Sequence, residues 1–182
     1  MTPAAGSAPR CVLVTGAIGS GKTTVASTLV GRLALPYVSP DLYFHLLFRC
    51  DCCSAEQRYE RARNLCRHRL DGFLEAGRSF LWETVVASDW KWDFLSRCRR
   101  THLLTIVYVS VSPPDVCVER AERRAEAGWY RVSSQKVLAS HVSMSRDRDR
   151  LAAVAERFIS IENSTDRVIG PTRALEGALI NV

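Results

Sequence analysis

Residues 11–23 read CVLVTGAIGSGKT, and this stretch decides the fold. An apolar run rich in valine enters a glycine turn, and a helical stretch over 22–33 follows it. From Gly16 to Thr23 the turn satisfies the pattern G-x-x-x-x-G-K-[ST] at every position. Its glycines let successive backbone amides point inward at phosphate oxygens, and the N-terminus of the following helix adds a partial positive charge. The stretch therefore predicts a phosphate-binding loop between a strand and a helix.

The residues of this loop predict how a nucleotide binds. Lys22 is expected to reach the β- and γ-phosphates of ATP, and the Thr23 hydroxyl is expected to hold Mg²⁺. ATP and Mg²⁺ are therefore the predicted cofactors. The other residues predicted to contact the phosphates are Gly16, Ala17, Ile18, Gly19, Ser20, Gly21 and Thr24.

The rest of the chain alternates apolar runs with helical stretches, which is typical of a three-layer α/β fold. We expect a mostly parallel sheet of about five strands with helices on both faces. Ser54 and Gln57 have the spacing of a capping box and predict the start of a long helix. The later strands are expected over 35–39, 80–84, 102–111 and 158–163, and the helices over 54–77, over 115–128, and from about 42, 133 and 171.

Composition places the chain among ordinary globular proteins, with 182 residues, 47% of them hydrophobic and 24% charged. We expect a disordered tail over 1–9 and one domain over 10–182. No apolar stretch approaches the roughly 18 residues that cross a bilayer, and the N-terminus lacks the layout of a signal peptide. The sequence therefore predicts a cytoplasmic protein with no membrane partner.

Seven cysteines are expected to be reduced in such a protein. Cys50, Cys52 and Cys53, with Cys66 and His68 downstream, form the one plausible metal cluster. Their spacing matches no paired C-x-x-C framework, so metal binding there stays open.

The net charge is +6, and arginine supplies nearly all of the basic residues. Arginine binds phosphate bidentately, so this excess suits an anionic substrate or a nucleic acid. The arginines of 58–69 lie among acids, and those of 146–150 alternate with aspartates. Both groups are therefore expected to form solvated helix surfaces.

Asp41 follows the second expected strand by two residues. The carboxyl ends of parallel strands face the ligand crevice, so a carboxylate there can take the proton of an acceptor hydroxyl. The alternative is that Asp41 caps a helix that begins at Leu42. One residue could serve both roles.

Glu83 and Thr84 close the third expected strand. Glu83 could bind substrate hydroxyls or a metal-bound water, or it could be a structural partner for an arginine. Beyond this strand, Trp90 and Trp92 could stack on a ring of the substrate or pack against the sheet.

Among proteins with a phosphate-binding loop, a GTPase would need an Asn-Lys-x-Asp segment, and the sequence has none. A motor or transport ATPase usually has an apolar strand that ends in aspartate, whereas the strongest strand here runs into Ser-Val-Ser-Pro-Pro. The small size, an early Asp41 and a late arginine cluster are typical of small kinases of this superfamily.

Taken together, the loop, Asp41, Glu83-Thr84, the segment 120–136 and a late Glu-Asn-Ser resemble the zeta-toxin-like kinases. That family includes UDP-N-acetylglucosamine kinases and zeta-like ATPases, and the resemblance covers about residues 11–164. It implies that Asp41 is the catalytic base, that Glu83 contacts the acceptor, and that the segment 120–136 is a lid over the phosphates. The residues placed around that lid are Arg120, Arg124 and Arg131.

Arg120 and Arg124 are four residues apart, so they share one helix face and could grip one anion. The alternative is that they pair with Glu119, Glu122 or Glu126 in the same helix. Arg131 follows the helix stop at Gly128 and is the better candidate for a catalytic phosphate clamp. The substrate-binding set is completed by Thr84 and Trp90.

Three short stretches depart from the family pattern. They are Ser39-Pro40 before Asp41, Gly128-Trp129-Tyr130 in place of Gly-Gly-His, and the stretch 85–88 in place of Leu-Ser. The expected activity is an ATP- and Mg²⁺-dependent transfer of the γ-phosphate to a hydroxyl of a small-molecule or nucleotide-sugar-like acceptor. The alternatives are a polynucleotide 5′-hydroxyl kinase and a non-catalytic ATP-binding regulator, and the oligomeric state stays open.

Overall fold

The structure, a computed structural model, describes residues 8–47 and 53–164. Its centre is a five-stranded sheet in the order β2-β3-β1-β4-β5, and every pair of neighbours is parallel. This confirms the predicted fold class. The strands are β1 (Arg10–Gly16), β2 (Tyr37–Val38), β3 (Phe80–Glu83), β4 (Leu103–Ser110) and β5 (Arg157–Glu162).

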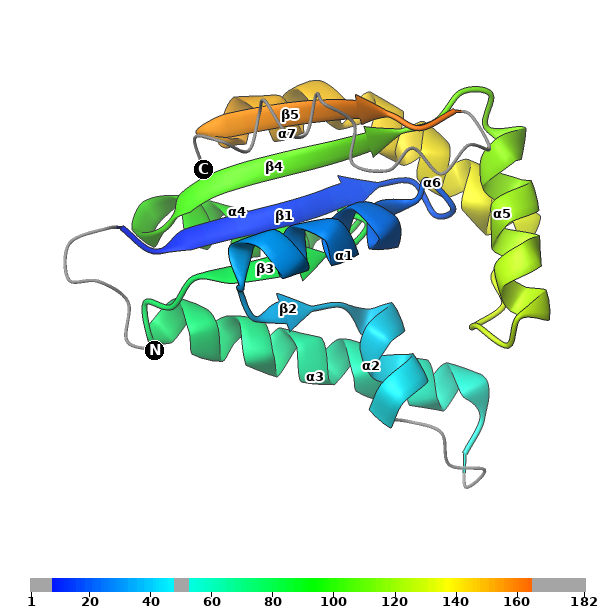
Figure 1. Cartoon of the computed structure of the whole chain (residues 1–182), viewed down its shortest axis with the longest axis horizontal. Helices are drawn as coiled ribbons and strands as arrows, with labels where there is room; N and C mark the ends of the chain where they lie inside the picture. Colours follow the sequence, from blue (N-terminus) through cyan, green and yellow to red (C-terminus); the bar gives the residue numbers. More distant parts are fainter. Residues whose placement is uncertain (1–7, 48–52, 165–182) are drawn as a thin grey trace.

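Helices cover both faces of this sheet, with α1 in front of it and α4 behind it in Figure 1. Helix α5 stands at the edge toward which the strands point. The bounds are α1 (Lys22–Leu33), α2 (Pro40–Leu47), α3 (Ala55–Glu75), α4 (Asp89–Thr101), α5 (Asp115–Glu126), α6 (Ser134–Arg146) and α7 (Arg148–Val154).

The two faces of β1 belong to different hydrophobic clusters. Leu13 packs in the cluster that includes Leu70 of α3 and Phe94 of α4. Val12 and Val14 face the other way and pack with residues of α1. Because both faces of the sheet are covered, its central strands are almost continuously apolar in sequence.

The expected capping box is present at the start of α3, where the Ser54 hydroxyl accepts a hydrogen bond from the Gln57 amide and the Gln57 side chain accepts one from the Ser54 amide. Helix α2 begins at Pro40, earlier than predicted, so Asp41 lies inside its first turn. The Ser39 hydroxyl, rather than Asp41, accepts the hydrogen bond from the Leu42 amide, at 3.4 Å. The capping alternative for Asp41 is therefore wrong.

Helix α4 was not predicted from the sequence, because its arginine-rich, tryptophan-containing stretch lacks a clear apolar repeat. It is held by three buried side chains, Phe94, Leu95 and Cys98. Helix α7 was not predicted as a separate element. Only one of its side chains, Leu151, is buried.

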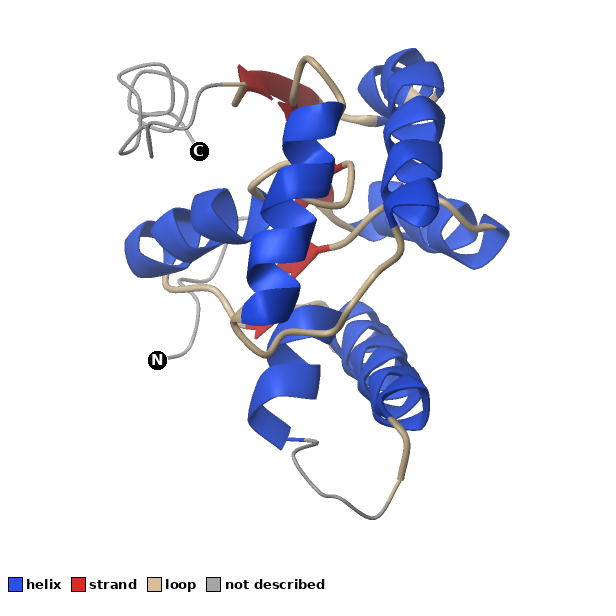
Figure 2. Cartoon of the chain, turned by 90° about the vertical axis from the view of Figure 1, so that its right-hand side faces the viewer, coloured by secondary structure: helices blue, strands red, loops and turns tan. Residues whose placement is uncertain are grey.

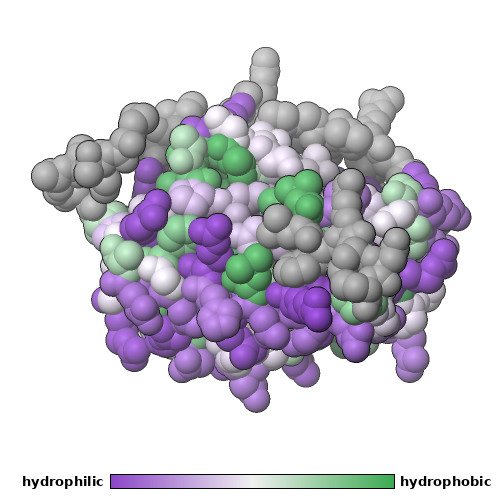
Figure 3. All heavy atoms as spheres, turned by 90° about the horizontal axis from the view of Figure 1, so that it is seen from below, coloured by the Kyte–Doolittle hydropathy of each residue, from purple (hydrophilic) through white to green (hydrophobic). Residues whose placement is uncertain are grey.

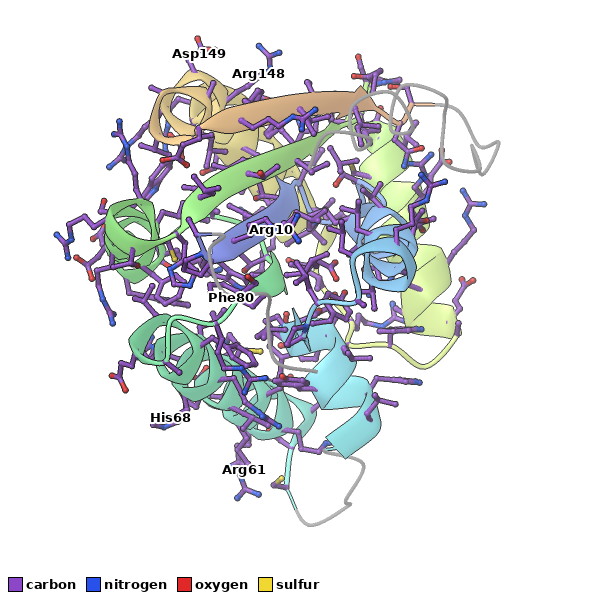
Figure 4. The ribbon with its side chains drawn as sticks, turned by 60° about the vertical axis from the view of Figure 1, so that its left-hand side comes forward. Arg10, Arg61, His68, Phe80, Arg148 and Asp149 are labelled. Atoms are coloured by element: carbon purple, nitrogen blue, oxygen red, sulfur yellow. The ribbon has the colours of Figure 1, made fainter. Side chains whose placement is uncertain are left out.

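Most charges of the arginine-rich helices turn outward, as predicted, but Arg63 of α3 lines the cavity described below, which the prediction of a solvated surface missed. Seen from below, where α3 lies, the molecule shows mainly hydrophilic residues (Figure 3). In Figure 4, Arg61 and His68 of α3 point away from the sheet, and Arg148 and Asp149 point outward on the opposite side. These four side chains therefore lie on the solvated surface.

Several predictions for the ends and the cysteines concern residues outside the described part. These are residues 1–7 of the tail predicted over 1–9, the helix from about 171, and Cys50 and Cys52. Within the described residues, five cysteines are free thiols, and no three His, Cys, Asp or Glu side chains gather as metal ligands. No helix of that part is both long enough and apolar enough to cross a membrane.

Candidate active site

A cavity of about 550 Å³ opens at the carboxyl ends of the strands, the edge viewed in Figure 2. Its lining comes from the predicted phosphate-binding loop (the P-loop, residues 16–23), from α2 and α3 on one side, and from α5 and α6 on the other. The end of β3 forms its floor. Residues far apart in the sequence therefore meet at the edge that the parallel topology predicted.

The P-loop is fixed by close contacts with α5, α6 and the segment after β5. The Ile18 amide donates to the Ser140 hydroxyl of α6 at 2.9 Å, and the Asn163 side-chain amide donates to the Ser20 carbonyl at 2.9 Å. Gly19 has a φ of +83°, and a Cβ there would lie 2.2 Å from the Cys117 carbonyl oxygen of α5. The loop can therefore adopt this curl only with glycine at position 19.

Gly19→Ala should lower the free energy of unfolding by about 1–3 kcal/mol, because the added methyl group overlaps backbone and the φ is left-handed. Thermal unfolding measures the change. Gly72→Ala is the matched control, since Gly72 lies in helix α3 with nothing within 4 Å of an added Cβ. The control should be neutral or stabilising by about 0.5–1 kcal/mol. Equal stability of the two variants would contradict the contact between the P-loop and α5.

Lys22 lies almost entirely buried at the base of the cavity. Its ammonium group donates to the Ala17 carbonyl across the P-loop. Burial lowers the pKa of Lys22, and the carboxylates of Glu83 and Asp41 oppose that shift. Burial therefore disfavours the charged form of Lys22, and a further negative charge, such as a bound phosphate, would stabilise it.

Glu83 is 3% exposed and accepts two hydroxyl hydrogen bonds. Thr23 donates to one carboxylate oxygen at 2.7 Å, and Tyr37 donates to the other. Burial raises the pKa of Tyr37, and the neighbouring Glu83 carboxylate adds to the shift. No arginine of the described residues pairs with Glu83, so its predicted alternative as an arginine partner is wrong.

Thr23 and Glu83 together fit a hard divalent cation. Mg²⁺ prefers oxygen ligands and usually keeps several bound waters. A neighbouring carboxylate can accept hydrogen bonds from those waters. A buried carboxylate beside the loop hydroxyl supplies that chemistry. Glu83 lies at the end of β3, which is a direct neighbour of β1 in the sheet.

Asp41 lies across the cavity from the P-loop, half-buried between α3 and α5. Tyr59 of α3 donates to one of its oxygens at 2.9 Å, and Arg124 of α5 donates to the other at 3.1 Å. Burial first, and then Asp41, raise the pKa of Tyr59, which therefore stays a hydrogen-bond donor. The carboxylate is thus positioned by three helices.

Aromatic rings close the side of the cavity between α2, α3 and the loop after α5. Tyr59 and Tyr130 stack with centroids 4.5 Å apart, and Phe44 meets both rings edge-on. Trp129 stacks on His45 at 4.5 Å, and the Arg124 guanidinium lies 4.8 Å above the Trp129 ring. The predicted lid segment therefore contacts α2 and α3 through these rings as well as through the ion pair between Arg124 and Asp41.

Nine residues of the predicted site are not among those that line the cavity. Six of them belong to the P-loop and the start of α1, namely Gly16, Ala17, Ser20, Gly21, Thr23 and Thr24. The other three are Arg120, Arg131 and Trp90. Arg120 donates to the Asn163 carbonyl at 2.9 Å, so it and Arg124 are directed at different partners. Arg131 is exposed. Trp90 packs on Trp82, with centroids 5.9 Å apart, which favours the packing alternative for this residue.

Four residues that line the cavity were not predicted from the sequence, namely Tyr59, Arg63, Lys91 and Lys136. Tyr37, which contacts Glu83 from outside the lining, was not predicted either. Most of them lie on helix faces that resemble solvated surface in sequence. One signal was available: the chain has only three lysines, Lys22, Lys91 and Lys136, and all three line the cavity.

Comparison with known proteins agrees with this geometry. A family model described as an AAA domain matches residues 11–157, which is most of the chain. The chain belongs to this family. A comparison of the sequence with curated proteins finds no match.

Three solved structures of similar fold cover nearly the whole chain. A protein from Chloroflexus aurantiacus that is provisionally named a kinase shares 18% identity with a TM-score of 0.67, over 97% of each chain. A chain of the PezAT chromosomal toxin–antitoxin system of Streptococcus pneumoniae shares 17% identity with a TM-score of 0.64, over 96% of this chain and 77% of that one. Shikimate kinase from Bacteroides thetaiotaomicron shares 20% identity with a TM-score of 0.51, over 94% and 95%. At these identities the likeness concerns the fold alone, and that fold is the kinase-like P-loop fold.

Proposed function

We propose that this protein is a kinase that transfers the γ-phosphate of ATP to an alcohol hydroxyl of a small acceptor. The observation that carries the proposal is that a carboxylate at the start of α2, Asp41, lines the same cavity as a complete P-loop and is held there by Tyr59 and Arg124. A cavity of about 550 Å³ is of the size that encloses a small molecule. The kinase-like fold and the resemblance to zeta-toxin-like kinases support the same reaction.

The transfer step assigns a separate task to each side of the cavity. The Asp41 carboxylate takes the proton of the acceptor hydroxyl as its oxygen forms a bond to the γ-phosphorus. The bond from that phosphorus to the β,γ-bridging oxygen breaks, and ADP leaves. Lys22 and the P-loop amides hold the phosphates in line with the incoming oxygen. Arg124, which borders both the cavity and Asp41, is placed to offer donors to the transferred group.

Mg²⁺, when bound, would neutralise charge on the β- and γ-phosphates. Thr23 and Glu83 are the residues that would hold it, Thr23 through its hydroxyl and Glu83 through a bound water. In the structure the two side chains already lie 2.7 Å apart.

Glu83→Gln should weaken the apparent affinity for Mg²⁺ by about 10–100-fold, because the amide keeps the shape of the side chain and loses its charge. Titration of Mg²⁺ against turnover, and calorimetry of Mg²⁺ binding in the presence of ATP, both measure this. Glu75→Gln, an exposed acid at the end of α3, is the control and should leave the titration unchanged. An unaltered Mg²⁺ requirement in Glu83→Gln would show that Glu83 only braces Thr23 and Tyr37.

The direct test of the proposed activity is ADP formation in the presence of Mg²⁺ and a panel of alcohols that includes sugars, nucleosides, sugar nucleotides and 5′-hydroxyl oligonucleotides. We expect one class of acceptor to stimulate ADP formation. Stimulation by oligonucleotides alone would favour a polynucleotide kinase. ATP binding with no stimulation by any member would favour the non-catalytic regulator.

A further inference from the structure

Two of the three cavity lysines have no role in the proposed phosphate transfer. Lys22 belongs to the P-loop, but Lys91 lies in the first turn of α4 and Lys136 in the first turn of α6. Lys136 is exposed, whereas Lys91 is partly buried just beyond the end of β3. Lys91 therefore requires a separate explanation.

Lys91 is a cation without a carboxylate. Its ammonium group donates to the Val85 carbonyl at 2.6 Å, and no acid of residues 8–47 and 53–164 forms an ion pair with it. Burial lowers the pKa of Lys91 to about 8, and the nearby positive charges of Arg63 and Lys22 add to the effect. Buried charges are normally paired, so this site is incomplete without an anion.

Arg63 of α3 contributes a second positive charge to the same part of the cavity. Its guanidinium lies 5.5 Å above the ring of Tyr59, and Tyr59 in turn donates to Asp41. Arg63 also pairs with Glu60, an acid of the same helix that lies outside the cavity lining, and both side chains are about half exposed. Lys91, Arg63 and Asp41 therefore border one region of the cavity.

The acids of the cavity do not neutralise these cations. Five basic residues and two acidic residues line it, the acids being Asp41 and Glu83. Glu83 is engaged by Thr23 and Tyr37, and Asp41 by Tyr59 and Arg124. An acceptor with negative charge of its own would complete the balance, whereas a cationic acceptor would be repelled.

We propose that the acceptor is a small anionic alcohol whose carboxylate or phosphate ester binds Lys91 and Arg63 while its hydroxyl reaches Asp41. This assignment of the acceptor rests on the proposed kinase activity, but the anion site itself does not. The ring of Tyr59, between Arg63 and Asp41, is placed to contact the carbon skeleton that joins the two groups.

The test measures binding of matched alcohols by calorimetry at pH 7, with the P-loop filled by Mg²⁺ and a non-hydrolysable ATP analogue so that anions do not enter it. The first set is glycerol, glycerate and glycerol 3-phosphate. The second set is glucose, gluconate and glucose 6-phosphate, with glucosamine as the cationic member. We expect the anionic members to bind about 10–100-fold more tightly than the neutral ones, the range of a charge-assisted hydrogen bond. Comparing the affinities of the carboxylate members with those of the phosphate members then shows which anion the site prefers.

Lys91→Met should remove most of that preference, and Lys91→Arg should retain it. Arg100→Met, which removes an exposed charge at the far end of the same helix, is the matched control and should bind like the wild type. Because a buried lysine with a lowered pKa disfavours folding in its charged form, the Tm of Lys91→Met at pH 7 should be no lower than that of the wild type. A loss of anion binding is then not a loss of the fold.

Two results would overturn the inference. The first is equal affinity for the neutral and the anionic alcohols, including no binding of either. The second is a preference for anionic alcohols that is unchanged in Lys91→Met. Failure of the inference is distinguishable from failure of the proposed function. Phosphate transfer to neutral alcohols in preference to anionic ones would keep the kinase and reject the anion site. Lys91-dependent binding of anionic alcohols without transfer of phosphate would keep the anion site and count against the kinase.

Discussion

Asp41→Asn should lower kcat by about 10²–10⁴-fold, because the amide cannot take the proton of the acceptor hydroxyl. The substitution keeps the size of the side chain and an oxygen that accepts hydrogen bonds from Tyr59 or Arg124. The ion pair with Arg124 is partly exposed, with side-chain exposures of 36% and 30%, so its loss should cost less than about 1 kcal/mol of stability. ATP affinity, measured by calorimetry, should stay within a few-fold of the wild type.

The control for this substitution is Asp71→Asn. Asp71 also lies on a helix and also pairs with an arginine, Arg97, at 2.9 Å, but it does not line the cavity. This variant should keep full turnover. Tyr59→Phe separates a catalytic Asp41 from one that only holds the helices together, because it removes one positioning bond and leaves the carboxylate. Equal losses in Tyr59→Phe and Asp41→Asn would favour the purely structural role.

Lys22→Met should abolish turnover, with a loss of at least about 10²–10³-fold, since the group that stabilises the phosphate charge is removed. The same variant should unfold at a temperature no lower than the wild type. Burial lowers the pKa of Lys22, so the charged ammonium destabilises the folded state at neutral pH, and methionine removes that cost. Steady-state kinetics and thermal unfolding of one preparation test both halves.

Arg32→Met provides the control for Lys22→Met. Arg32 lies at the other end of the same helix and is exposed, so its loss should change neither turnover nor nucleotide binding. Retained turnover in Lys22→Met would mean that the P-loop does not hold the reacting nucleotide. A marked fall in Tm would mean that Lys22 is retained for the fold.

The sequence predicted the parallel sheet because its evidence was local. The P-loop, the apolar run of β4 and the capping box at Ser54 each consist of neighbouring residues with one physical meaning. Helix α4 was missed because its core-facing stripe is short and arginines surround it. The start of α2 was misplaced because proline in a first helical turn reads equally well as a residue of the preceding turn.

For the site, the sequence located residues that follow strands and, apart from Arg124, missed the cavity-lining side chains on the later helices. Asp41 and Glu83 were identified because parallel strands end at a common edge. Tyr59 and Arg63 reach the same cavity only because α3 crosses beside α2, and the helical pattern alone does not show which face turns inward. Arg120 and Arg124 share a face in sequence, yet their long side chains reach different partners.

The most direct test of the central claim is to follow the label of γ-labelled ATP in the presence of Mg²⁺ and an acceptor that stimulates ADP formation, with Lys22→Met as the blank. The proposed kinase predicts that the label moves to the hydroxyl of the acceptor in an amount equal to the ADP formed, and that it moves nowhere in the blank. Label found only as inorganic phosphate, at a rate that the acceptor does not change, would contradict the proposed kinase activity and identify an ATPase.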